Sequence, residues 1–85
     1  MRQAHRIAES ADRTVTGVIV EINADSRTFV IRDHTHRQIT CDLGWKIFEN
    51  YDWSVGEKVR VRGQYIKRAR RDKLIVRSDP IFPNA

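Results

Sequence analysis

Five short segments rich in β-branched residues, each bounded by turn residues, limit this chain to a small all-β fold. The segments are residues 14–23, 27–33, 37–43, 57–66 and 73–78. Alternation is clearest in residues 57–66, where Val59, Val61 and Tyr65 fall on one side of the expected strand. The chain has 85 residues, too few to build two well-covered sheets from five strands. We therefore expect a single sheet closed into a barrel, which removes its exposed edges.

One segment interrupts the strand pattern. Residues 45–53, WKIFENYDW, hold few β-branched residues and place Trp45, Phe48 and either Tyr51 or Asp52 at helical spacing. We predict a short helix here that closes one end of the barrel with Trp45 and Phe48. The expected element order is that of the OB-fold, a five-stranded Greek-key barrel with the helix between strands 3 and 4. An SH3-like barrel is the main alternative, although that fold usually lacks this helix.

The predicted barrel spans residues 14–79, after a flexible or helical N-terminal arm over residues 1–13 and before a C-terminal tail over residues 80–85. Gly17 would allow the first strand to bend and to pair in two directions. Alternation predicts that the following residues line the barrel: Val18, Val20, Ile22, Phe29, Ile31, Ile39, Cys41, Val59, Val61, Leu74 and Val76.

Charge is distributed unevenly along the chain. The whole sequence has 16 basic and 11 acidic residues and a net charge of +5. Residues 57–77 contain nine of the basic and two of the acidic residues, which leaves seven basic and nine acidic residues elsewhere. This quarter of the chain therefore carries +7 and the remainder −2. Such asymmetry is typical of a surface that binds an anionic partner.

Three runs, GVIVEINADSRTFVIRDHTHRQITCDLGW, VGEKVRVRGQY and KLIVRSDPI, resemble OB-fold domains along nearly the whole chain. The run VGEKVRVRGQ looks like the signature that opens the fourth strand of many nucleic-acid-binding OB domains. The same pattern is also similar to a bacterial OB-fold family of periplasmic stress proteins, in which a Trp follows the third strand, as Trp45 does here. The first resemblance implies nucleic-acid binding, and the second implies a small ligand or a protein partner. The strongly basic fourth and fifth strands depart from the second family.

In nucleic-acid-binding OB domains the ligand crosses strands 2 and 3, between the loop joining strands 1 and 2 and the loop joining strands 4 and 5. On this chain the resemblance places these loops at residues 23–27 and 67–72. Outward positions on the two strands would be Thr28, Val30, Arg32, Arg37, Gln38 and Thr40. We expect single-stranded DNA or RNA to bind through its phosphates with low sequence specificity.

The predicted nucleic-acid-binding residues are Arg32, Arg60, Arg62, Tyr65, Lys67, Arg68, Arg70, Arg71, Lys73 and Arg77. The arginines suit this role because a planar guanidinium pairs with phosphate oxygens and stacks on bases. Tyr65 is the one aromatic residue beside the basic loop, and its alternation with Val59 and Val61 also fits core packing.

Other chemistry receives little support from the sequence. Asp33, His34 and His36 could approach a metal ion, but they fit a polar hairpin turn more simply. Cys41 is the single cysteine, so an internal disulfide is excluded and a buried thiol is expected. We find no nucleophile–base pair and no cofactor motif, so we expect a binding module without enzymatic activity, cofactor or metal. A fragment of a larger enzyme stays an alternative. With no apolar run of about 20 residues and no signal peptide, we expect no membrane association and a cytoplasmic location.

Overall fold

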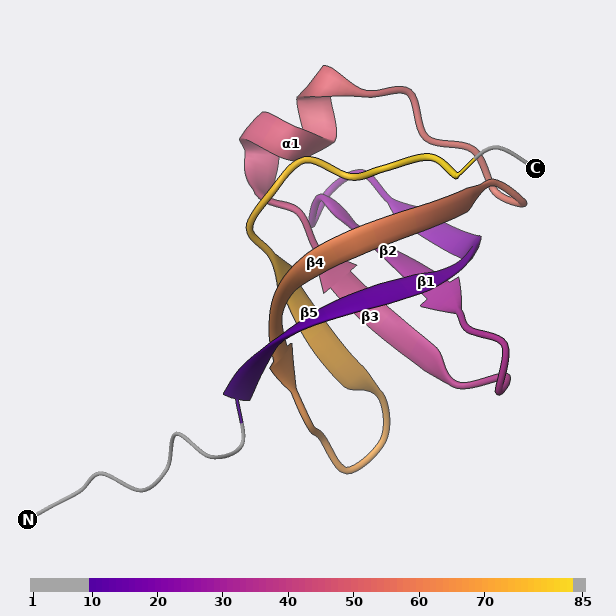
Figure 1. The fold of residues 1–85 in the computed structure, drawn as a ribbon. Helices are drawn as coiled ribbons and strands as arrows, with labels where there is room; N and C mark the ends of the chain where they lie inside the picture. Colours follow the sequence, from indigo (N-terminus) through magenta and orange to yellow (C-terminus); the bar gives the residue numbers. More distant parts are fainter. Residues whose placement is uncertain (1–9, 84–85) are drawn as a thin grey trace, which may run out of the picture.

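The sheet closes on itself through the long first strand. A computed structural model describes residues 10–83 (Figure 1). The elements are β1 (Ser10–Asn23), β2 (Thr28–Arg32), β3 (Gln38–Asp42), α1 (Gly44–Asn50), β4 (Lys58–Ile66) and β5 (Asp72–Val76). The strands form a closed barrel in the order β1-β2-β3-β5-β4. The predicted five-stranded barrel with one short helix between the third and fourth strands is confirmed, and the arrangement is consistent with an OB-like fold.

Strand β1 pairs with two neighbours, and Gly17 lies where it changes partners. The first part of β1 pairs with β4 and the last part pairs with β2, with Val18 in both ladders. A Cβ atom at Gly17 would lie 2.7 Å from the carbonyl oxygen of Arg32, so the close passage of β1 over β2 requires glycine. Strand β1 begins at Ser10, four residues before the expected start. The rest of the expected N-terminal arm, residues 1–9, lies outside the described residues.

Strands β3 and β5 are parallel, and this pairing positions the site. Their register runs from Ile39 opposite Asp72 to Asp42 opposite Ile75. Because parallel strands begin at the same edge of a sheet, the loop before β5 lies beside the turn before β3. Figure 1 shows this loop at the opposite end of the barrel from α1.

The barrel interior holds eleven hydrophobic residues: Ile19, Phe29, Ile31, Ile39, Cys41, Leu43, Val59, Val61, Tyr65, Leu74 and Val76. The sequence-based prediction for β1 was wrong at Val18 and Val20. Val18 is 38% exposed and Val20 is half-buried, whereas Ile19 is fully buried. Relative to β2, strand β1 has one extra residue between Ile19 and Glu21. This bulge changes which residues face inward, so both Ile19 and Ile22 pack against the core.

Helix α1 covers one end of the barrel, but Trp45 does not take part in the cap. Phe48 packs against the core as predicted, together with Ile47 and Trp53. Trp45 is 63% exposed, which corrects its expected role. The inward side of the helix is centred between Ile47 and Phe48, and at about 100° per residue Trp45 lies about 110° away from that direction. Within residues 10–83, no helix is long and apolar enough to cross a membrane.

Candidate nucleic-acid interface

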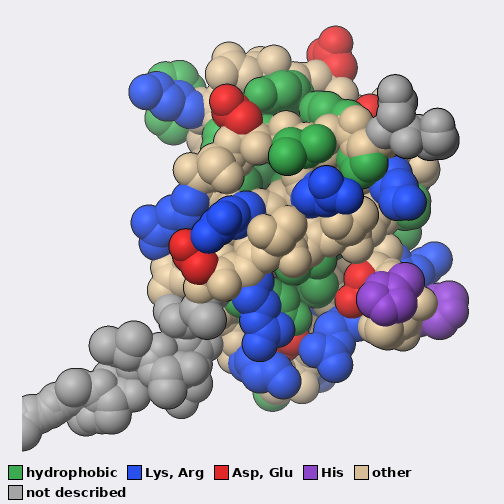
Figure 2. Space-filling model, viewed as in Figure 1, with side chains coloured by type: hydrophobic (Ala, Val, Ile, Leu, Met, Phe, Trp, Pro, Cys, Tyr) green, Lys and Arg blue, Asp and Glu red, His purple; other side chains and the backbone are tan. Residues whose placement is uncertain are grey.

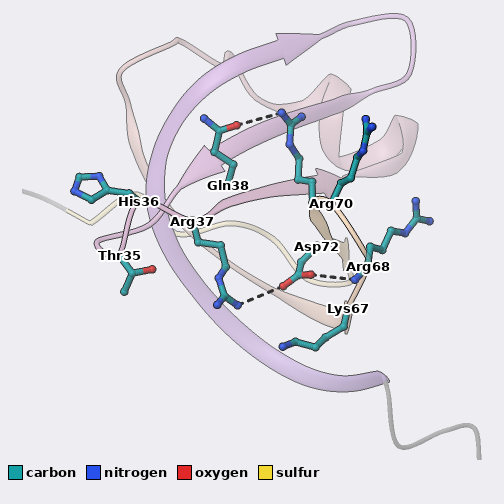
Figure 3. Close-up of a pocket in the computed structure, with 9 residues that line it drawn as sticks. Thr35, His36, Arg37, Gln38, Lys67, Arg68, Arg70 and Asp72 are labelled. Carbon is teal, nitrogen blue, oxygen red and sulfur yellow. Dashed lines mark hydrogen bonds and ion pairs between the residues drawn. The ribbon is translucent and has the colours of Figure 1, made fainter.

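Four cations lie in the five-residue loop 67–71 that joins β4 to β5. All four side chains are exposed: Lys67, Arg68, Arg70 and Arg71. With the turn between β2 and β3, the loop encloses a hollow of about 750 Å³ (Figure 3). The turn contributes Thr35, His36 and Arg37, and Gln38 at the start of β3 completes this side. The hollow therefore combines two connections that are 30 or more residues apart in the sequence and that the parallel β3–β5 pair brings together.

Asp72 anchors the loop at the start of β5. Its carboxylate accepts a hydrogen bond from the Tyr65 hydroxyl at 2.6 Å and another from the Arg68 backbone amide at 3.0 Å. Arg37 Nη1 lies 3.4 Å from the same carboxylate. Figure 3 shows Arg37 reaching towards Asp72, while the side chain of Arg68 points away from it. The hydrogen bonds from Tyr65 and the Arg68 amide, with the nearby positive charges of Lys67 and Arg37, hold the pKa of Asp72 below its ordinary value.

Asp33 organises the turn on the other side of the hollow. Its Oδ1 atom accepts hydrogen bonds from the Thr35 amide at 2.9 Å, the Thr35 hydroxyl at 2.6 Å and the Arg37 amide at 3.0 Å. Partial burial opposes ionisation of Asp33, but these hydrogen bonds outweigh it and lower its pKa. The Asp33 carboxylate thus stabilises the turn, and the turn places the Arg37 side chain beside Asp72. Among the residues that the structure describes, no group of three or more His, Cys, Asp or Glu side chains could hold a metal ion.

The Arg71 side chain lies across the outer face of β2 and β3. Its Nη2 atom donates to Gln38 Oε1 at 3.1 Å, and its Nη1 atom lies 3.9 Å from Glu21 Oε1. In the sheet, Val30 lies between Glu21 and Thr40, so a side chain that joins Gln38 to Glu21 passes over it. Val30 is only 5% exposed although it belongs to the outward side of β2.

The other three loop cations have no such partner. The side chains of Lys67, Arg68 and Arg70 make no ion pair or hydrogen bond with any residue in 10–83. Their charges are therefore exposed and uncompensated by direct contacts within this part of the chain. Guanidinium and ammonium groups in this state are suited to oxyanions, and above all to phosphate.

The structure separates some of the predicted site residues from the hollow. Arg60 donates to Thr16 on β1, and Arg62 lies 3.8 Å from Asp12. Figure 2 shows blue side chains along β4 and a second group at the loop end, beside the histidines. Arg77 donates to Gln64 just beyond the far end of β5. The basic surface therefore extends beyond the hollow, but Arg60, Arg62 and Arg77 do not line it.

Three remaining predicted residues lie close to the hollow in different ways. Arg32 is exposed on β2, opposite Gln38 in the ladder, and so shares the face that Arg71 crosses. Lys73 is half-buried on β5, 3.8 Å from Asp42. Tyr65 is 4% exposed, and the guanidinium carbon of Arg13 lies 4.5 Å from its ring centroid. Its ring is covered, and it supports the loop through its hydroxyl group.

Sequence reasoning missed the contribution of the β2–β3 turn. Arg37 and Gln38 were expected to point outward, but neither they nor His36 were assigned to the binding site. The sequence-based prediction included no parallel strand pair, and the parallel pairing of β3 and β5 is what places residues 33–37 beside residues 67–71. Comparison of the chain with protein-family models, with curated proteins and with solved structures finds no match. The charge and geometry of the hollow are therefore what point to its ligand.

Proposed function

We propose that this chain is a small binding module for single-stranded DNA or RNA, which it holds by the phosphates with low sequence specificity. The observation that carries the proposal is the loop 67–71, in which three of four cations have no partner within residues 10–83. Asp72 fixes the backbone of this loop, so the cations are held near one another despite their mutual repulsion. Phosphates that replace the loop's counterions would relieve that repulsion and release ions from the nucleic acid.

The outer face of β2 and β3 offers a path for the strand. In OB-like barrels this face binds oligonucleotides between the β1–β2 and β4–β5 loops. Arg32, Gln38 and Thr40 lie on this face, and Arg71 already crosses it. Phe29, the one aromatic residue of the two strands, points into the core. Stacking therefore contributes little on this face, and electrostatic attraction dominates, which predicts strong salt dependence.

A binding titration at several salt concentrations tests the proposal. Each phosphate contact to a single strand contributes about 0.7 to the slope of log affinity against log salt. Arg70→Ala should therefore lower the slope by about 0.7 and weaken binding about equally for all sequences. The matched control is Lys58→Ala, which removes one exposed positive charge at the far end of β4. It should leave the slope nearly unchanged.

Two results would overturn the proposal. The first is that the wild-type protein binds neither single-stranded DNA nor single-stranded RNA at low salt. The second is that Arg70→Ala keeps both the wild-type affinity and the wild-type slope. Duplex DNA should be included in the same titration. A preference for duplex would indicate that a surface other than the β2–β3 face binds the nucleic acid.

A further inference from the structure

Trp45 lies in a second hollow, at the other end of the barrel from the basic loop. The hollow has a volume of about 610 Å³, and its walls include Leu43, Trp45, Lys46, Ile47, Arg77 and Asp79. The Trp45 side chain is 63% exposed, although a residue of this type buries much of its surface in most proteins. Its exposure leaves an aromatic ring accessible to a ligand.

The two hollows lie at opposite ends of the same strand pair. The loop 67–71 precedes the aligned starts of β3 and β5, and the Trp45 hollow follows their aligned ends. Arg77 is the fifth residue after Asp72, which corresponds to about 17 Å of extended chain. Lys73 lies between the two hollows on β5, and Arg77 belongs to the second hollow. The outward side of β5 therefore connects the basic loop to the Trp45 hollow, with Lys73 beside Asp42 at its start and Arg77 at its end.

The wall of this hollow combines charges of both signs with an apolar surface that suits a base. Lys46 and Arg77 are basic, but Asp79 lies in the same wall and would repel a phosphate group. The apolar part of the wall, Leu43 and Ile47, suits the flat surface of a ring. An aromatic side chain stacks on any nucleobase, because every base has a π-face. Val55 is equally exposed at 63% but lies outside this hollow, so its exposure has no such chemistry beside it.

We propose that Trp45 stacks on a nucleobase of a single strand whose phosphates are bound by the loop 67–71. This inference rests on the proposed function and adds a specific contact for the bases. Stacking contributes about 1–3 kcal/mol per base, which corresponds to a change in affinity of about 5-fold to 150-fold. Because a base carries no charge, this contribution should be nearly independent of salt.

Two probes separate stacking from phosphate binding: a single-stranded oligothymidylate of about 15 nucleotides and inorganic polyphosphate, which has no bases. Trp45→Ala should weaken oligothymidylate binding by at least about 5-fold, leave the salt slope unchanged and leave polyphosphate binding unchanged. Trp45→Phe retains a ring and should recover most of the loss. Val55→Ala, which removes an equally exposed apolar side chain, is the matched control and should bind like the wild type.

Each contrary outcome has a distinct meaning. If the wild-type protein binds oligothymidylate with a slope that depends on Arg70, but Trp45→Ala binds equally well, the stacking inference is wrong and the proposed function stands. If Trp45→Ala also loses polyphosphate binding, or Trp45→Phe recovers nothing, Trp45 supports the shape of the protein and the inference is likewise overturned. If the wild type binds no single strand at low salt, the proposed function itself fails.

Discussion

Asp72 shows how one buried carboxylate can shape a basic surface. It is 8% exposed, and its two oxygens bind the Tyr65 hydroxyl, the Arg68 amide and the Arg37 guanidinium. These partners come from β4, from the loop and from the β2–β3 turn. The negative charge thus connects three segments, while the side chains of Lys67, Arg68 and Arg70 form no ion pair or hydrogen bond with it.

The lowered pKa of Asp72 predicts a pH-dependent contribution to stability. Because the pKa is lower in the folded than in the unfolded state, the contribution is complete well above the ordinary value of 3.8 and is lost as the pH falls below it. Asp72→Asn should cost about 1–3 kcal/mol of unfolding free energy at neutral pH, since it weakens the buried hydrogen bond from Tyr65 and the partly buried contacts with Arg68 and Arg37. The difference from wild type should shrink in acid. Urea unfolding of both proteins at neutral pH and at about pH 3, roughly one unit below the ordinary pKa of an aspartate side chain, would measure this difference.

The exposed residue Asp25 provides the control for this measurement. Asp25→Asn removes the same charge from the β1–β2 turn and should change stability by less than about 0.5 kcal/mol. An Asp72→Asn cost that is equally large at both pH values would show that shape, and not ionisation, is what Asp72 contributes.

Substitution of Phe29 and substitution of Trp45 should have very different effects on stability. Phe29 is 1% exposed and makes a T-shaped contact with Trp53, with ring centroids 4.9 Å apart. Phe29→Ala should therefore cost about 3–5 kcal/mol of unfolding free energy. Trp45→Ala should cost less than about 0.5 kcal/mol, because most of its side chain is already in solvent. Thermal or urea unfolding of the two variants tests this, and equal losses would contradict the position of the helix.

Among the elements, the strands were predictable but the register of β1 was not. Turn residues and β-branched runs located all five strands, and a change of spacing located the helix. The run TVTGVIVEIN is apolar on both sides, so alternation could not decide whether Val18 or Ile19 faces inward. The bulge after Ile19 then shifts the pattern within a single strand. Such a shift depends on how β1 passes from β4 to β2, which local sequence does not record.

The close approach of β4 and β5 depends on Gly63. A Cβ atom there would overlap the Ile75 carbonyl oxygen more severely than a Cβ at Gly17 would overlap the Arg32 oxygen, which would lie 2.7 Å away. Both contacts involve backbone, which cannot move as a side chain can. Gly63→Ala should therefore lower the free energy of unfolding by more than the usual overpacking cost of about 1–3 kcal/mol. Gly17→Ala should lower it by less than Gly63→Ala does. Chemical denaturation would rank the two, and the reverse order would mean that β5 shifts more easily than β2.

At the scale of the whole molecule, the site was predictable in its charge and only partly in its shape. The +7 segment identified the loop 67–71 directly. In the closed barrel the two parts of that segment lie apart. The loop lines the hollow, whereas Arg60 and Arg62 contact residues of β1. It also brought in Arg37 from a part of the sequence with no basic excess. A count of charges along the sequence cannot make this distinction, because the outward residues of a strand and the residues of the loop that follows it lie on different parts of the barrel surface.

The pairing of Arg71 with Glu21 gives the last prediction, which assumes the proposed nucleic-acid binding. Glu21 lies 3.9 Å from Arg71 on the face where a strand would cross, so a phosphate must compete with this carboxylate. The pair is exposed, and pairs of this kind contribute about 0–1 kcal/mol, so Glu21→Gln should tighten binding by up to about 5-fold. Glu49→Gln removes the same charge from an exposed position on α1 and should have a smaller effect on binding.

In an Arg71→Ala background the two substitutions should have equal effects on binding, because the carboxylate of Glu21 no longer competes with a phosphate for Arg71. Titration of single-stranded DNA with these five variant proteins and the wild type would measure the coupling. An advantage of Glu21→Gln that persists without Arg71 would show that only net charge matters at this face.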